Sequence, residues 1–141
     1  MVRIKNLIAI REKLQQKYQK NTWAGSGEIQ ITSVQEKFIE DLKAIIEKNI
    51  DNSQYSVDDL GAAIAMSRSQ VHRKLKAITD QSATKFIRNY RLHRAAELIK
   101  IGSGNITEIA YQVGFSSQTY FSSCFQELFA CSPSQYKAKF S

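Results

Sequence analysis

From Ser33 onward, hydrophobic residues recur every three or four positions, and polar residues occupy the positions between them. This spacing places apolar side chains on one face of an α-helix. The first such stripe comprises Phe38, Leu42, Ile45 and Ile46. No segment alternates regularly enough between apolar and polar residues to predict a strand. The pattern therefore predicts an all-α protein with seven helices after residue 32.

The starts of these helices are marked by a serine or an asparagine three residues before an acid or an amide. This spacing is that of a capping box, in which two side chains satisfy free backbone N–H groups at the helix start. The pairs are Ser33 and Glu36, Ser56 and Asp59, Ser67 and Gln70, Asn105 and Glu108, and Ser132 and Gln135. Ser82 and Ser117 are predicted as further caps. The longest helix, residues 82–101, would extend about 30 Å.

One part of this pattern occurs twice. The aligned pairs are Val57/Ile106, Leu60/Ile109 and Ile64/Val113 at an offset of 49 residues, then Val71/Phe121, Leu75/Phe125, Ile78/Leu128 and Ser82/Ser132 at an offset of 50. Each copy predicts a short helix, a tight turn and a longer helix, which is the helix-turn-helix plan. The turns contain Ala65 and Gly114. Glycine readily adopts the left-handed conformation that ends a helix, whereas alanine is strained there.

Composition and charge narrow the possible functions. The 141 residues include 20 Lys and Arg against 13 Asp and Glu, a formal net charge of +7 that favours an anionic partner. Cys124 and Cys131 are far in sequence from His72 and His93, so these residues form no metal-ligand cluster. No Gly-rich phosphate loop, paired-carboxylate motif or nucleophile elbow is present. We therefore expect no enzymatic activity, no metal, no cofactor and no small-molecule ligand. The sequence also lacks a membrane-spanning run and a signal peptide, which predicts a cytoplasmic protein.

Several motifs resemble those of the AraC/XylS family of transcription regulators. Residues 110–126, AYQVGFSSQTYFSSCFQ, and residues 132–136, SPSQY, resemble the family signature. Residues 66–76, MSRSQVHRKLK, are similar to the family's first recognition helix, and residues 86–98, FIRNYRLHRAAEL, to its connecting helix. The resemblance implies a DNA-binding domain over residues 33–141. Two helix-turn-helix units, 33–81 and 102–141, are then joined by the connecting helix 82–101 and enter successive major grooves of duplex DNA, about 34 Å apart.

The first 32 residues carry a second resemblance. Residues 1–20 are predicted as a basic helix and residues 21–32 as a linker. The segments 3–8 and 11–14 resemble the end of a response-regulator receiver domain, as in hybrid two-component sensors that carry kinase, receiver and AraC-type output in one polypeptide. This implies that the chain is the output domain of a longer protein with histidine kinase activity, whether or not that protein is membrane-anchored. The implied partners are the upstream receiver and sensor region, a second copy on activation, and RNA polymerase. A dimerising helix or contact with an acidic membrane surface remains the alternative for residues 2–18.

The family resemblance also implies which side chains contact DNA. The positions that match base-reading residues are Ser69, His72 and Arg73 on the first recognition helix and Gln118, Thr119, Tyr120 and Ser123 on the second. Arginine suits guanine O6 and N7, and glutamine suits adenine N6 and N7. Phosphate contacts are expected from Arg68, Lys74, Lys76, Arg88, Arg91 and Arg94. The alternatives are a solvated polar face for the cations and His72, an acidic partner for Arg91, and packing against the first unit for Tyr120.

The chain departs from the family pattern in its second unit. Position 123, commonly arginine in the family, is Ser123 here, and residues 105–131 contain Glu108 and Glu127 but no Lys or Arg. Because phosphate neutralisation supplies much of the affinity for DNA, we expect the second unit to bind more weakly than the first, or to act partly as a scaffold. The alternative function is a helical protein-interaction or dimerisation module with only non-specific affinity for DNA.

Overall fold

The computed structural model describes residues 32–140, and this part of the chain contains seven helices and no strand. They are α1 (Ser33–Lys48), α2 (Val57–Ala63), α3 (Arg68–Thr79), α4 (Ala83–Lys100), α5 (Ile106–Gln112), α6 (Gln118–Phe129) and α7 (Pro133–Ala138). The predicted all-α class is confirmed. The predicted basic helix of residues 1–20 lies outside the described residues, as does the linker apart from Thr32. From Phe38 onward the chain forms one compact unit. None of the helices between residues 32 and 140 has the length and apolar character that a membrane span needs.

The predicted caps account for most helix starts. Capping boxes begin α2 at Ser56, α3 at Ser67, α5 at Asn105 and α7 at Ser132, and serine side chains cap α4 and α6. The prediction for α1 is wrong by one residue. Thr32, not Ser33, exchanges hydrogen bonds with a partner three positions on, and that partner is Gln35.

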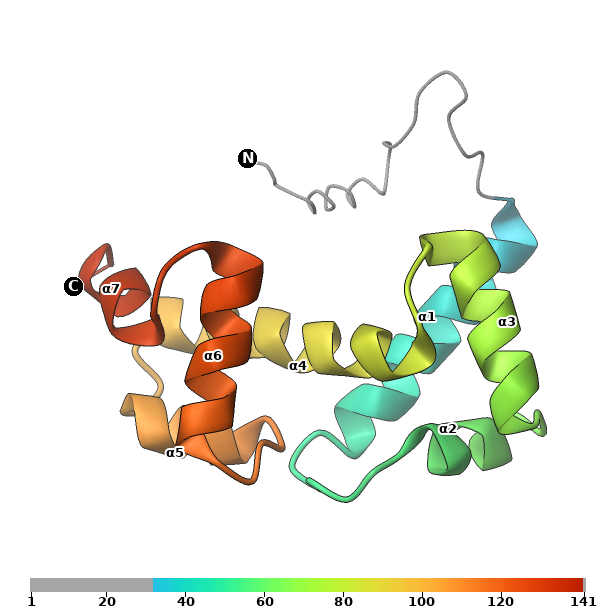
Figure 1. Cartoon of the computed structure of the whole chain (residues 1–141), viewed down its shortest axis with the longest axis horizontal. Coiled ribbons are helices and arrows are strands. Elements are labelled where there is room, and N and C mark those ends of the chain that lie inside the picture. The colour runs from blue at the N-terminus through green and yellow to red at the C-terminus, as the bar shows by residue number, and fades with distance from the viewer. Residues whose placement is uncertain (1–31, 141) are drawn as a thin grey trace. The chain divides into compact units, whose positions relative to one another are not determined.

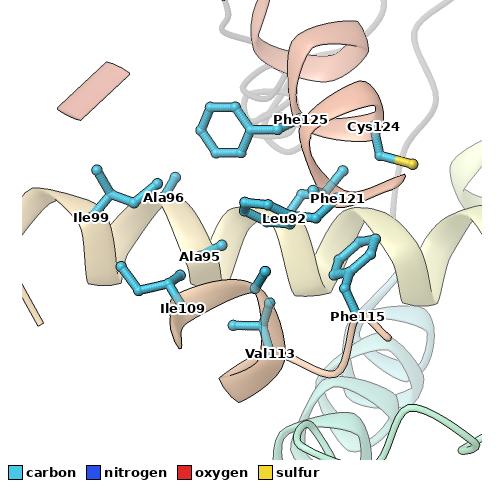
Figure 2. Close-up of a cluster of buried hydrophobic side chains, with 11 residues drawn as sticks. Leu92, Ala95, Ala96, Ile99, Ile109, Val113, Phe115, Phe121, Cys124 and Phe125 are labelled. Carbon is cyan, nitrogen blue, oxygen red and sulfur yellow. The ribbon is translucent and has the colours of Figure 1, made fainter. Parts of the chain in front are cut away.

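The connecting helix α4 contributes to two hydrophobic cores. Near its start, Phe86 and Ile87 join a first core whose other members come mainly from α1, α2 and α3, namely Leu42, Ile46, Val57, Leu60, Val71 and Leu75. Towards its end, Leu92, Ala95 and Ile99 join a second core built with α5 and α6 (Figure 2). The two helix-turn-helix units therefore sit at opposite ends of α4, as Figure 1 shows.

The internal repeat of the sequence is also a repeat of the fold. The paired residues Leu60 and Ile109, Val71 and Phe121, and Leu75 and Phe125 are all completely buried. The longer helices α3 and α6 end alike, because Asp80 and Ala130 adopt nearly the same left-handed conformation, with φ of 62° and 63°. Both units thus use one plan, and α3 and α6 are the equivalent second helices.

The turns of the two units also adopt equivalent conformations. Ala65 has φ of 59° and Gly114 has φ of 92°, so the strain expected for alanine is present in the first turn. Ala65 is exposed, which leaves room for its methyl group. Gly114 has no such room. A Cβ atom at this position would overlap Nη1 of Arg91 and the carbonyl oxygen of Ile50. Glycine is therefore required at position 114 by contact as well as by conformation.

A polar cluster fixes α1 to α4. The Tyr90 hydroxyl donates to Glu47 Oε1 at 2.6 Å, and Arg94 donates to both carboxylate oxygens of Glu47 at 3.2 and 2.8 Å. The hydrogen bond from Arg94 holds the pKa of Glu47 below its ordinary value, while burial and Glu47 raise the pKa of Tyr90. This cluster anchors the first helix to the middle of α4 over the first core.

Glycine at position 114 gives a test of this packing. We expect Gly114→Ala to destabilise the fold by at least about 2 kcal/mol more than Gly102→Ala. Gly102 is a matched control, because its φ is 70° and nothing lies within 4 Å of a Cβ there. The control therefore carries only the left-handed strain, about 1 kcal/mol. Urea unfolding of the two variants measures the difference. Equal losses would show that the contact with Arg91 and Ile50 does not constrain position 114.

Candidate nucleic-acid interface

The exposed face of α3 gathers most of the residues predicted to contact DNA. It lies opposite the buried Val71, Leu75 and Ile78. At the helical rotation of about 100° per residue, its members are Arg68, Ser69, His72, Arg73 and Lys76. Four of the five are exposed and His72 is half-buried. The face carries three permanent cations and no carboxylate of its own.

His72 belongs both to this face and to the fold. The backbone N–H of Ala83, the first residue of α4, donates to Nδ1 of His72 at 3.0 Å. A backbone N–H can only donate, so Nδ1 must be the unprotonated nitrogen and the ring proton must be on Nε2. His72 thus satisfies one free N–H group at the start of α4. It retains a single donor, Nε2–H, for a ligand.

The cations around this face have partners that they can exchange. Arg68 lies 3.7 Å from Asp58, and Lys76 lies 3.6 Å from Asp80; all four side chains are more than half exposed. Such exposed pairs contribute little, so these cations can turn towards an anion at small cost. Lys74 is placed differently, because its ammonium group lies 4.5 Å from the centre of the Phe38 ring on α1. The predicted role of Lys74 stays a prediction.

The equivalent face of α6 is uncharged. Gln118, Thr119, Ser122, Ser123 and Gln126 line a shallow hollow there. With the offset of 50, these five positions correspond one by one to the five on α3. Ser122 and Gln126 are absent from the sequence-based set, although the repeat pairs them with His72 and Lys76. The repeat alone would have been sufficient to find them.

Two predicted residues of α6 are held by neighbouring side chains. The Thr107 hydroxyl of α5 donates to Oε1 of Gln118 at 2.6 Å. A carbonyl oxygen has two lone pairs, so Gln118 retains one acceptor site and its amide N–H groups. Tyr120 is 54% exposed, and its ring lies 5.8 Å from that of Phe115 in the turn of its own unit. Tyr120 is therefore supported from within the second unit.

The three arginines of α4 occupy different environments. Arg91 is buried, and its guanidinium donates to the carbonyl oxygens of Ile50, Val113 and Asn52 at 2.5, 2.7 and 3.1 Å. Burial lowers the pKa of Arg91, although an arginine remains charged. The prediction that Arg91 contacts phosphate is incompatible with this position and is corrected. Its hydrogen-bond partners are backbone carbonyls, and electrostatic attraction to Asp51, the acid next to Ile50, partly offsets the effect of burial on its pKa.

Arg94 and Arg88 differ from Arg91 and from each other. Arg94 pairs with Glu47 and, at 2.7 Å, with Glu97, and its contact with phosphate stays a prediction. Arg88 lies at a small cavity between α4 and α6, which is also lined by Lys85, Asn89, Cys124, Glu127 and Leu128. Its Nε atom is buried without a hydrogen-bond partner among the described residues. Arg88 therefore stays a candidate for phosphate contact.

The two faces thus differ in what they can bind. The α3 face offers cations, which attract phosphates, together with a guanidinium and an imidazole N–H, which suit base edges. The α6 face offers amides and hydroxyls, which can read base edges but cannot neutralise phosphate. Within residues 32–140, no group of three or more His, Cys, Asp or Glu side chains could hold a metal ion.

Comparison with known proteins identifies the chain as a helix-turn-helix protein. A family model described as a helix-turn-helix domain matches residues 60–139, more than half of the chain. The chain is 35% identical over 95 residues to the HTH-type transcriptional regulator MtrA of Neisseria gonorrhoeae, covering 66% of this chain and 32% of MtrA. It is 38% identical over 140 residues to histidine kinase P4 of Formosa agariphila, covering 99% of this chain and 10% of that kinase. The chain thus spans about a third and about a tenth of these two relatives.

Solved structures narrow the family. An AraC-type transcriptional regulator from Chromobacterium violaceum superposes with a TM-score of 0.70 at 27% identity, covering 78% of this chain and 97% of that one. The C-terminal domain of the response regulator yesN from Fusobacterium nucleatum superposes with a TM-score of 0.64 at 25% identity. This match covers 72% of this chain and 98% of that one. The DNA-binding domain of AdpA, solved with a target DNA, shares the fold with a TM-score of 0.65 at 22% identity. This match covers 72% of this chain and 91% of that one. The chain belongs to the AraC-type helix-turn-helix family of transcription regulators.

The two functions of His72 can be separated by substitution. In His72→Asn, the amide oxygen takes the place of Nδ1, so the hydrogen bond from Ala83 is kept. In His72→Gln, the amide takes the place of Nε2, so that hydrogen bond is lost. In urea unfolding, we expect His72→Gln to be about 1 kcal/mol less stable than His72→Asn, although glutamine is a better helix former than asparagine. A more stable His72→Gln variant would mean that the bond to Ala83 contributes nothing.

Proposed function

We propose that this chain recognises a specific duplex DNA sequence with two unequal recognition helices and regulates transcription as the output part of a signalling protein. The observation that carries the proposal is the correspondence of the two exposed faces. Five positions of α3 and the five equivalent positions of α6 all carry polar side chains, and both helices are presented by the same helix-turn-helix plan. A repeated surface of this kind fits a repeated ligand such as successive major grooves.

The α3 face supplies most of the affinity in this proposal. Arg73 and the Nε2–H of His72 contact base edges, with Ser69 beside them, while Arg68 and Lys76 contact phosphates. Each phosphate neutralised releases counterions, and the observed binding constant then falls more steeply with salt. Arg88 adds a further phosphate contact from α4.

The α6 face supplies sequence discrimination with little affinity of its own. Gln118, oriented by Thr107, contacts a base edge, and Thr119 and Ser123 contact neighbouring positions. Tyr120, which is exposed on the same helix, is a further candidate for base contact. Glu108 and Glu127 are the charged residues of α5 and α6, so these two helices carry no side-chain cation to neutralise a phosphate. The preference of one DNA sequence over another therefore depends on both helices, whereas the salt dependence arises from the first unit and α4.

A signalling role is supported by the relatives. Nearly the whole chain matches part of a histidine kinase, and the fold matches the C-terminal domain of a response regulator. We propose that an upstream receiver and sensor region brings two copies of this domain together in the cytoplasm. Two linked copies join two weak sites into one tight site through effective concentration. RNA polymerase is the proposed partner at the promoter, by family resemblance.

The decisive experiment is a selection followed by a titration. The chain selects duplexes from a library with about 25 random base pairs, enough for two major grooves one turn apart. Fluorescence anisotropy then compares the selected duplex with a scrambled one over a salt series. A preference that persists at about 150 mM salt supports specific recognition. Equal binding that collapses with salt would support the alternative, a helical interaction module with non-specific affinity for DNA.

The inequality of the two helices gives a separate prediction. We expect Arg73→Ala to weaken binding to every duplex and to lower the salt slope by about one phosphate equivalent. Arg73→Lys keeps the charge and should restore the slope, but not the base preference, because lysine lacks the paired donors. Gln118→Ala should change the preference at one base position and leave the slope unchanged. Lys43→Ala, which removes a cation from α1, is the control. A slope change for Gln118→Ala as large as that for Arg73→Ala would contradict this division.

A further inference from the structure

We infer that Arg91 is a positioning residue that holds the two helix-turn-helix units at one relative setting, so that the chain accepts one spacing between the two halves of its DNA site. This inference rests on the proposed function. It assigns to Arg91 a role in specificity although its side chain lies in the interior, away from both exposed faces.

The contacts of Arg91 join the two units directly. Nη1 donates to the carbonyl oxygen of Ile50, which follows α1 in the first unit, and to that of Val113, which caps the C-terminal end of α5 in the second. Nη2 donates to the carbonyl oxygen of Asn52. One guanidinium therefore bridges two segments that are both near helix C-termini, where carbonyl groups lack intrahelical partners and favour a cation.

The bridge requires a fixed geometry because its charge is buried. Arg91 is 6% exposed, and a buried cation is tolerated only when its donors are paired. Its acceptors at Ile50, Asn52 and Val113 are all backbone carbonyls, in the segment that follows α1 and at the end of α5. A change in the angle between the units would pull Val113 away from Ile50 and leave the cation without acceptors on one side. The charge thus resists motion in either direction.

The residues around Arg91 are tightly packed. Gly114, next to Val113, approaches so closely that even a Cβ would overlap Nη1 of Arg91. Ile50 packs its side chain against the second core while its carbonyl accepts from Arg91. The segment between α1 and α2 therefore contacts the second unit through both its backbone and its side chain.

Without this bridge, α4 would be the main connection between the two units. The substantial helix packing within the described residues is either inside one unit or against α4, and none of it joins α3 to α6. A single long helix can bend, so one connection leaves an angle free. A second connection through Arg91, Ile50 and Val113 removes that freedom. The uncharged α6 face then reaches its groove only where α3 and the bridge place it.

The test uses Arg91→Met and Arg91→Lys. Methionine keeps an unbranched apolar chain and removes the charge, whereas lysine keeps the charge but cannot reach three acceptors in a fork. Val71→Ala, in the first core and remote from the bridge, is a control for loss of stability alone. Each variant is titrated with the duplex selected by the wild-type chain, with a duplex that keeps only the half bound by α3, and with one carrying about five extra base pairs, half a turn, between the halves.

We expect the insertion to weaken binding by the wild-type chain by at least about tenfold, because α6 then faces the wrong side of the duplex. Arg91→Met should lose affinity for the full site by a similar factor, lose most of the penalty for the insertion, and keep its affinity for the half-site within about twofold. For Arg91→Lys, we expect an affinity for the full site and an insertion penalty between those of the wild-type chain and Arg91→Met. Val71→Ala should keep the full insertion penalty.

A second readout needs no DNA. Spin labels at Ser69→Cys and Ser123→Cys, in a background of Cys124→Ala and Cys131→Ser, report the distance between α3 and α6. We expect one narrow distribution with Arg91 present and a broader one in Arg91→Met. If Arg91→Met does not fold, Arg91→Lys, which keeps the charge but not the fork of donors, serves as the second variant.

The outcomes separate the two proposals. A wild-type chain without any preferred duplex removes the proposed function, but the spin-label distribution still tests the bridge. A wild-type chain with a preferred duplex, combined with an Arg91→Met variant that keeps both the narrow distribution and the insertion penalty, overturns the inference. Equal losses of Arg91→Met on the half-site and the full site also overturn it, because they indicate a general structural defect.

Discussion

The eighteen residues of α4 bury apolar side chains in two cores, and neither core closes without them. Phe86 and Ile87 complete the first core, and Leu92, Ala95 and Ile99 complete the second. A pair of short helices cannot bury its apolar faces alone, so each helix-turn-helix unit needs this third element. Because both cores lie along the same helix, α4 sets the separation of the two recognition helices, and the bridge through Arg91 sets the angle between them.

The constraint explains why the two units agree inside and differ outside. Leu75 and Phe125 occupy equivalent positions, and each is buried in a core to which α4 contributes, so the interior of each unit must remain apolar. The exposed face is limited only by what it binds. There, Arg73 corresponds to Ser123, and Lys76 to Gln126. Affinity and sequence reading can therefore be divided between two copies of one fold without changing the way either copy packs.

The sequence predicted the features that depend on near neighbours. Helical periodicity and capping boxes are set within a few residues, so the elements and nearly all starts were predictable. The start of α1 was wrong because Thr32 with Gln35 makes the same bonds as the expected pair one residue later. Arg91 was misassigned for a different reason. Its acceptors at Ile50 and Val113 are backbone carbonyls 41 and 22 residues away, which leave no signature in side-chain identity.

The interior position of Arg91 and the lack of charge on α6 are connected by the energetics of binding. A recognition helix with cations can find DNA alone, because phosphate attraction acts at long range. A face of amides and hydroxyls has only short hydrogen bonds, which contribute nothing when the helix is displaced by a few ångströms. Such a face is useful only if the protein has already fixed its place. A buried cation that tolerates one geometry provides that fixing, so the second unit can discriminate sequence without binding strongly by itself.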